Sequence, residues 1–223
     1  MLKTKSLYIV FEGGEGSGKT TQARFLAEKM GAVLTREPGA TRIGSELRAI
    51  LLNPDNKQLD PITEAYLMAA DRSQNMVEEV IPGIKAGRHV VSDRSFVSSI
   101  AYQGSGRGLG EERILQLNLL IPHLVIPDIM FLMMPPSPEE LTRRLDRPLD
   151  RIEQAGADFH NKLSTSFGQM ANFLASHPQT ASIQVITIQP EAIGRPKSVE
   201  EIHQEVSLKV QDFCDERDLV SPI

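Results

Sequence analysis

Apolar residues along this chain occur in short, nearly continuous runs that alternate with longer segments of mixed apolar and polar positions. The short runs predict β-strands at residues 7–12, 32–35, 89–93, 128–133 and 183–188. Strands without a polar alternation are typical of sheets that are covered by helices on both faces. Alternation of such strands with helical segments is typical of βαβ units. The sequence therefore predicts an α/β protein with a doubly wound, five-stranded parallel sheet.

The segments between these strands have the spacing of amphipathic helices. Helices are predicted at residues 18–30, 43–53, 61–82, 96–103, 110–121, 137–146, 158–176 and 198–213. The last should begin at Ser198, because Glu201 three residues later gives the spacing of a capping box. Two stretches break the pattern, the glycine-rich residues 103–112 and the arginine-rich residues 142–158, and we expect both to be mobile surface elements. A single domain is expected over residues 1–223.

Composition narrows the classes of function. The formal net charge is -5, so we expect no broad basic surface and no nucleic-acid partner. The single cysteine, Cys214, excludes an intramolecular disulfide framework and a cysteine-rich zinc site, and we expect it to be structural. No apolar run reaches about 18 residues, so no membrane span is expected. The N-terminal run passes into glycines and glutamate rather than a cleavage site, and a cytoplasmic protein is expected.

A phosphate-binding loop is the strongest local signal. Residues 13–20, GGEGSGKT, match G-x-x-x-x-G-K-[ST] and lie between a predicted strand and a predicted helix. In such a loop the backbone N–H groups surround an anion at a helix N-terminus. Lys19 would reach the β- and γ-phosphates, Thr20 would bind Mg²⁺, and Thr21 would contact the α-phosphate. The expected nucleotide contacts are Gly13, Gly14, Glu15, Gly16, Ser17, Gly18, Lys19, Thr20 and Thr21, with ATP or GTP as the ligand.

The phosphate acceptor must be inferred from other segments. Neither residues 56–59 nor residues 161–164 complete the N-K-x-D pattern of guanine readers, which argues against a GTPase. Arginines instead follow or adjoin predicted strand ends within residues 35–48, 68–74 and 92–107. A guanidinium binds phosphate through two N–H groups and stays charged. We expect Arg94 to bind the acceptor phosphate and Asp93 to lie near Mg²⁺ or to hold Arg94; a simple salt bridge at the strand end is the alternative.

Four motifs in the order FEGGEGSGKTT, TREPG, DRSFVSSIAYQGSGR and LDRIEQAGADFH extend this pattern across most of the chain. Together they resemble the thymidylate kinase family, which phosphorylates dTMP with ATP and Mg²⁺. The resemblance implies a P-loop NTPase fold of three α/β/α layers with a five-stranded parallel sheet and a helical lid at about residues 142–158. It also implies a homodimer. Another nucleotide kinase, or a regulatory P-loop ATPase, stays the alternative.

The same resemblance implies roles for individual acceptor-site residues. Arg48 and Arg94 would bind the acceptor phosphate, and Glu15 would contact the 3'-hydroxyl of the sugar. Arg72 would donate to the thymine carbonyl, and Tyr102 would crowd a ribose 2'-hydroxyl. Ser98, Ser99 and Gln103 would meet the edge of the pyrimidine, and Glu37 would precede a cis peptide bond to Pro38. Without the motifs, Glu15 would be a solvated acid, Arg48 and Arg72 surface arginines, and Tyr102 a half-buried packing residue.

The lid and two departures complete the sequence-based picture. Because residues 15–17 contain no arginine, the resemblance implies that the lid supplies the positive charge to the ATP phosphates. The candidates are Arg143, Arg144 and Arg147, with Arg151 completing the lid; a solvated helix face is the alternative. Met68 stands where the family has a phenylalanine that stacks on thymine, and its sulfur can still pack against a ring. Ser164 replaces a late-lid arginine of the family.

Overall fold

The computed structural model describes residues 5–135, 149–192 and 195–223. Its strands are β1 (Tyr8–Gly13), β2 (Val33–Arg36), β3 (Val90–Asp93), β4 (Ile129–Met133), β5 (Gln184–Ile188), β6 (Glu191–Ala192) and β7 (Arg195–Pro196). Its longer helices are α1 (Lys19–Met30), α2 (Arg42–Leu52), α3 (Pro61–Asn75), α6 (Glu111–Leu119), α8 (Ala157–Ala175) and α9 (Val199–Asp215). Shorter helical pieces are η1 (Met76–Val80), α4 (Ile81–Lys85), α5 (Phe96–Ser99) and η2 (Ile100–Gly106).

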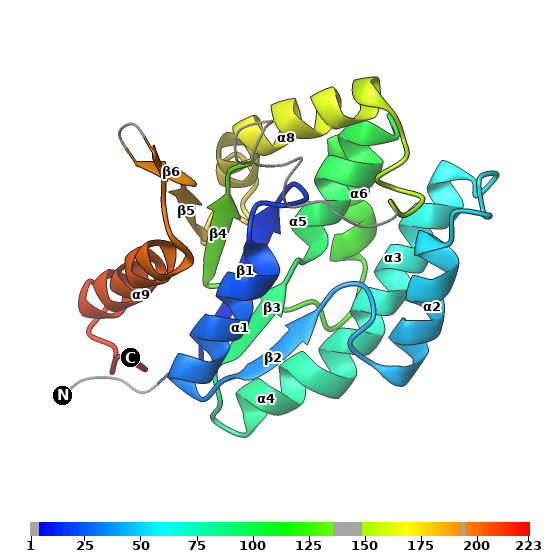
Figure 1. The fold of residues 1–223 in the computed structure, drawn as a ribbon. Helices are drawn as coiled ribbons and strands as arrows, with labels where there is room; N and C mark the ends of the chain where they lie inside the picture. The colour runs from blue at the N-terminus through cyan, green and yellow to red at the C-terminus, as the bar shows by residue number, and fades with distance from the viewer. Residues whose placement is uncertain (1–4, 136–148, 193–194) are drawn as a thin grey trace.

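Five strands form one parallel sheet in the order β2-β3-β1-β4-β5 (Figure 1). The central strand β1 pairs with β3 on one side, where Phe11 lies opposite Asp93, and with β4 on the other, where Gly13 lies opposite Met133. The predicted number and direction of the main strands are confirmed. Because parallel strands end at the same edge, the segments that follow β1, β3 and β4 converge there.

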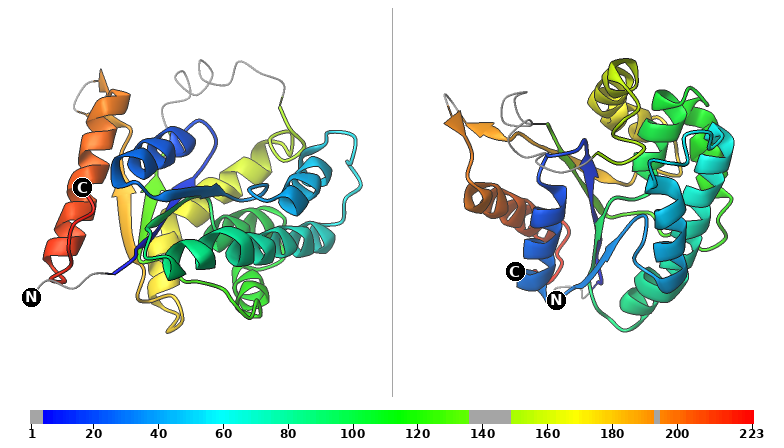
Figure 2. Two further views of the ribbon diagram at one scale, coloured as in Figure 1. Left: turned by 90° about the horizontal axis from the view of Figure 1, so that it is seen from below. Right: turned by 45° about the vertical axis from the view of Figure 1, so that its right-hand side comes forward.

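Helices cover both faces of this sheet and form two apolar cores, as the non-alternating strands predict. On one face α1 and α9 pack against alternate strand residues that include Ile9, Phe11 and Phe131. On the other face α3, α5, η2, α6 and α8 pack against Tyr8, Val10 and neighbouring positions (Figure 2). The family's three-layer arrangement is therefore present. None of the helices in the described ranges is long and apolar enough to cross a membrane.

Several helix boundaries differ from the sequence prediction. The helix expected over residues 61–82 ends as an α-helix at Asn75 and continues through the π-helical turn η1 into α4, whose first turn contains Pro82. Proline cannot donate the backbone hydrogen bond that a regular helix requires there. The helix expected at 96–103 is the short α5 followed by the π-helical turns of η2.

Three further outcomes concern the second half of the chain. The capping box at Ser198 is confirmed, since the Ser198 side chain accepts from the Glu201 N–H and the Glu201 carboxylate accepts from the Ser198 N–H. The antiparallel pair β6 and β7 was not predicted. The helix predicted at residues 137–146 lies outside the described residues.

Candidate functional site

The phosphate loop joins β1 to α1 and closes on itself. Gly13 has a φ of 134°, and a Cβ there would lie 2.2 Å from the carbonyl oxygen of Met133, so only glycine fits beside β4. The Lys19 Nζ donates to the carbonyl oxygen of Gly14 at 2.6 Å and contacts Ser17 Oγ at 3.4 Å. Ser17 Oγ also donates to the Gly14 oxygen, at 2.9 Å. The loop therefore holds the lysine ammonium against its own backbone through the Gly14 carbonyl oxygen.

Burial makes Lys19 an unusual lysine. The side chain is buried, and this lowers its pKa to about 8; the nearby charge of Arg94 acts in the same direction, whereas Glu15 and Asp93 oppose it. A buried cation is stabilised by a polyanion that replaces its lost hydration. An anion beside Lys19 would therefore stabilise the charged form of this side chain.

Thr20 and Asp93 bring two oxygen ligands together beside the loop. Thr20 Oγ1 donates to Asp93 Oδ2 at 2.5 Å. The other carboxylate oxygen, Asp93 Oδ1, is buried and has no hydrogen-bond partner within the described residues. Oxygen donors of this kind suit Mg²⁺, which keeps several waters and shares its coordination with phosphates. Within the same ranges, no cluster of three or more His, Cys, Asp or Glu side chains could hold a metal.

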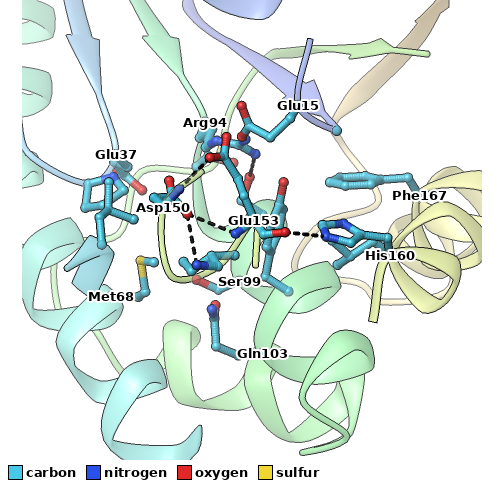
Figure 3. Close-up of a pocket in the computed structure, with 18 of the residues that line it drawn as sticks. Glu15, Glu37, Met68, Arg94, Ser99, Gln103, Asp150, Glu153, His160 and Phe167 are labelled. Carbon is cyan, nitrogen blue, oxygen red and sulfur yellow. Dashed lines mark hydrogen bonds and ion pairs between the residues drawn. The ribbon is translucent and has the colours of Figure 1, made fainter. Parts of the chain in front are cut away.

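Arg94 follows β3 in a left-handed conformation, with a φ of 76°. Its guanidinium donates to the Gly13 carbonyl oxygen at 3.1 Å, to Ser98 Oγ at 3.1 Å and to the Glu15 carboxylate at 2.5 Å. Figure 3 shows Arg94 and Glu15 side by side. The guanidinium also lies 5.1 Å from the ring centroid of Tyr102. Arg94 is therefore not paired with Asp93 at the strand end; it faces the phosphate loop.

A buried carboxylate, Glu12, fixes this arrangement and was missed by the sequence reasoning. Glu12 Oε1 accepts from Ser95 N and Ser95 Oγ, both at 2.7 Å, and from Ser98 N at 3.3 Å, while Oε2 accepts from Ser98 Oγ at 2.5 Å. Burial raises the pKa of Glu12, and the serine hydrogen bonds oppose this shift. The signal in the sequence was an acid at the end of an apolar strand, which must find buried donors.

A cavity of about 410 Å³ opens beside Arg94. Every residue predicted to bind the acceptor lines it: Glu15, Glu37, Arg48, Met68, Arg72, Arg94, Ser98, Ser99, Tyr102 and Gln103. Figure 3 shows Glu15 and Arg94 at one end of the cavity and Gln103 at the other, with Met68 on one side and Phe167 facing it. The end of the lid segment and the chain after it supply further lining residues that the sequence reasoning missed, including Asp150, Glu153, His160 and Phe167.

Arg72 lies inside the protein rather than on a helix surface, with 2 % of its area exposed. Its Nε donates to Glu37 Oε2 at 2.7 Å, and its Nη2 donates to the Ser95 carbonyl oxygen at 3.1 Å and to Ser99 Oγ at 3.2 Å. Its Nη1 donates to Asn118 Oδ1. These contacts hold the guanidinium plane rigidly against the cavity. The Glu37–Pro38 peptide bond is cis, as predicted.

Tyr102 and Arg48 also lie at the cavity wall. Tyr102 is 8 % exposed and packs edge-on against Phe167, with ring centroids 6.1 Å apart. Arg48 Nη1 donates to the Pro38 carbonyl oxygen at 2.9 Å, so this arginine is tied to the same loop that carries Glu37. Both residues are therefore placed to contact a ligand in the cavity.

The lid arginines have different outcomes. Arg143, Arg144 and Arg147 lie outside the described residues. Arg151 is buried and donates to the Leu51 carbonyl oxygen at 2.8 Å and to Glu64 Oε2 at 2.7 Å. The structure thus gives Arg151 partners at α2 and α3, and its contact with ATP stays a prediction.

Comparison with known proteins gives one consistent result. A family model described as thymidylate kinase matches residues 11–187. A thymidylate kinase from Caldicellulosiruptor saccharolyticus is 35 % identical over 220 residues, covering 96 % of this chain and 100 % of the relative. One from Exiguobacterium sibiricum is 41 % identical over 170 residues, covering 74 % of this chain and 80 % of the relative. The crystal structure of thymidylate kinase from Ehrlichia chaffeensis superposes with a TM-score of 0.70 at 29 % identity, covering 93 % of this chain and 99 % of that one.

Proposed function

Since the chain belongs to the thymidylate kinase family, we propose that it transfers the γ-phosphate of ATP to dTMP and gives dTDP through the residues described above. The observation that supports these assignments most strongly is the shared cavity. Ten residues from separate segments of the chain line one space next to a phosphate loop. A nucleotide switch or regulatory ATPase has no need for such a second site.

The acceptor needs no strong general base, because its phosphate oxygen is already ionised at neutral pH. The protein instead has to neutralise charge and align two polyanions. In this proposal Lys19 and the backbone N–H groups of residues 13–20 bind the ATP phosphates. Arg94 lies between this loop and the cavity and binds the acceptor phosphate, assisted by Arg48. Arg143, Arg144 and Arg147 close over ATP from the lid.

Thr20 and Asp93 would hold the Mg²⁺ that accompanies ATP. Their hydroxyl and carboxylate oxygens fit this ion, and one Asp93 oxygen lacks a partner within the described residues. The ion would neutralise negative charge on the phosphates. Asp93 keeps the Thr20 side chain oriented for this role through their hydrogen bond.

In this proposal dTMP binds in the cavity in one direction. Arg94 and Glu15 at one end would take the phosphate and the sugar 3'-hydroxyl, as Figure 3 shows for their positions. The base would extend toward the opposite end, where Arg72, Ser99 and Gln103 offer polar groups. Met68 would pack on one face of the ring through its sulfur, and the Tyr102 ring would exclude a 2'-hydroxyl.

A homodimer is also part of the proposal. Large apolar side chains are exposed on α2, α3 and η1, including Ile50 at 44 %, Tyr66 at 61 % and Val77 at 51 %. A second copy of this chain would cover them. The buried free Cys214 is compatible with a reducing compartment, so we place the protein in the cytoplasm.

The test is ATP-dependent phosphoryl transfer in the presence of Mg²⁺ to dTMP, dUMP, UMP, dCMP, dGMP and thymidine. Preferred turnover of dTMP is expected. Preference for another monophosphate would reassign the acceptor, and turnover of thymidine would require a general base that the proposal lacks. ATP hydrolysis without transfer to any acceptor would favour a regulatory ATPase.

A further inference from the structure

A buried carboxylate, Glu64, lies behind the base end of the cavity and does not line it. Its side chain has no exposed area. It forms ion pairs with Arg151 at 2.7 Å and with Arg107 at 3.1 Å. Its Oε1 also accepts a hydrogen bond from Gln103 Nε2 at 2.8 Å. Glu64 therefore contacts both a charged cluster and a residue of the cavity wall.

This contact decides which atom Gln103 presents to a ligand. A carboxylate only accepts hydrogen bonds, so the NH₂ group of Gln103 has to face Glu64. The other amide atom, Gln103 Oε1, is buried and has no hydrogen-bond partner within the described part of the chain. Gln103 lines the cavity and its amide points inward from η2 (Figure 3). The wall consequently offers an acceptor at this position.

Arg72 offers the complementary group. Its guanidinium is oriented by four contacts, to Glu37, Asn118, Ser95 and Ser99. Those contacts leave one N–H on Nη1 for a ligand. The base end of the cavity thus combines one donor from Arg72 with one acceptor from Gln103.

On the premise of the proposed function, we propose that Glu64 is a positioning residue that fixes the Gln103 amide and so selects imide bases, thymine and uracil, over cytosine. An imide presents an N3–H donor beside a carbonyl acceptor, which matches Gln103 Oε1 and the Arg72 N–H. Cytosine presents an N3 acceptor beside an amino donor, so both hydrogen bonds would be mismatched. A buried polar group left unpaired discriminates strongly between ligands.

The variant Glu64→Gln tests this assignment. A glutamine can face Gln103 with either an oxygen or an NH₂ group, so the Gln103 amide is free to rotate. We expect the ratio of kcat/KM for dTMP to that for dCMP to fall by about tenfold or more, while the ratio for dTMP to dUMP stays within about twofold. Equal losses for all three acceptors would show a purely structural role and would overturn the inference.

Two further variants make the test decisive. Arg107→Gln removes one ion-pair partner of Glu64 but keeps the bond to Gln103, so the dTMP to dCMP ratio should match that of the unmodified protein. Glu64→Asp keeps the charge near both arginines but withdraws it from Gln103, and it replaces Glu64→Gln if thermal unfolding shows that variant to be unfolded. An unchanged ratio in the folded variant overturns the inference. Absence of dTMP turnover in the unmodified protein would instead contradict the proposed function itself.

Discussion

Replacing Glu12 by glutamine should loosen the active-site end of β3 and lower stability and activity together. The Glu12 carboxylate accepts four hydrogen bonds, two from backbone N–H groups and two from hydroxyls, all from Ser95 and Ser98. Ser95 directly follows Arg94, and Ser98 lies three residues further along the chain. Glutamine is nearly the same size but supplies one neutral acceptor and one NH₂ group. The variant therefore removes charge and acceptors without creating a cavity.

The size of the effect follows from these contacts. A hydrogen bond to a charged group contributes about 1 kcal/mol more than a neutral one, so four bonds lose roughly 4 kcal/mol. Burial raises the pKa of Glu12, which means that the charged form carries a desolvation cost that glutamine avoids. Allowing about half of the loss for this relief leaves about 2 kcal/mol, or a fall in Tm of about 4–8 °C for a chain of this size.

The assays are urea and thermal unfolding at pH 7 together with kcat/KM for dTMP. We expect kcat/KM to fall at least about tenfold, because a small displacement of Arg94 misaligns the two phosphates. Glu46→Gln is the matched control, since Glu46 is exposed and pairs with Arg42 on the surface of α2; it should change stability by less than about 0.5 kcal/mol. Unchanged stability and turnover in Glu12→Gln would refute the reasoning.

Two other predictions concern Lys19 and Arg151. Because the Lys19 pKa is lowered to about 8, kcat/KM for ATP should fall as pH rises through that value and the ammonium loses its proton; a profile that is flat to pH 9 would contradict this. Arg151→Gln should cost about 2 kcal/mol of stability, since Arg107 would be the one ion-pair partner left to Glu64 among the described residues, and should raise KM for dTMP more than KM for ATP. The opposite order of KM effects would support the sequence-based assignment of Arg151 to ATP.

Features that depend on neighbouring residues in the sequence could be predicted from it. The apolar runs of β1 and β4 need no distant information, because a strand covered on both faces must be apolar throughout. The phosphate loop is equally local, since its glycines and Lys19 act within one turn of chain. The acceptor residues required the family resemblance, because Arg48, Arg72 and Gln103 lie on separate helical segments with no common local signal.

Buried polar contacts between distant segments could not be predicted in this way. Glu64 reads as an ordinary acid near the start of a helix, and only the fold brings it against Arg107 and Arg151. Arg151 lies in a segment dense in charge, which indicates a solvated face. Its bond to the Leu51 carbonyl oxygen joins residues that are far apart in the chain. Such pairs depend on how the helices pack rather than on any periodicity.

The left-handed backbone conformation of Arg94 has a local cost in folding free energy. A residue with a Cβ loses about 1–2 kcal/mol in this conformation, whereas glycine adopts it freely. The backbone is nevertheless held there, because Arg94 N donates to the Phe11 carbonyl oxygen and its own carbonyl accepts from Ser92 Oγ. Replacing Arg94 by glycine would relieve this strain, but it would also remove the contacts of the guanidinium with Gly13, Ser98 and Glu15. Glycine would also lack the guanidinium that we place on the acceptor phosphate, so selection for activity retains arginine in a conformation that the local backbone energy disfavours.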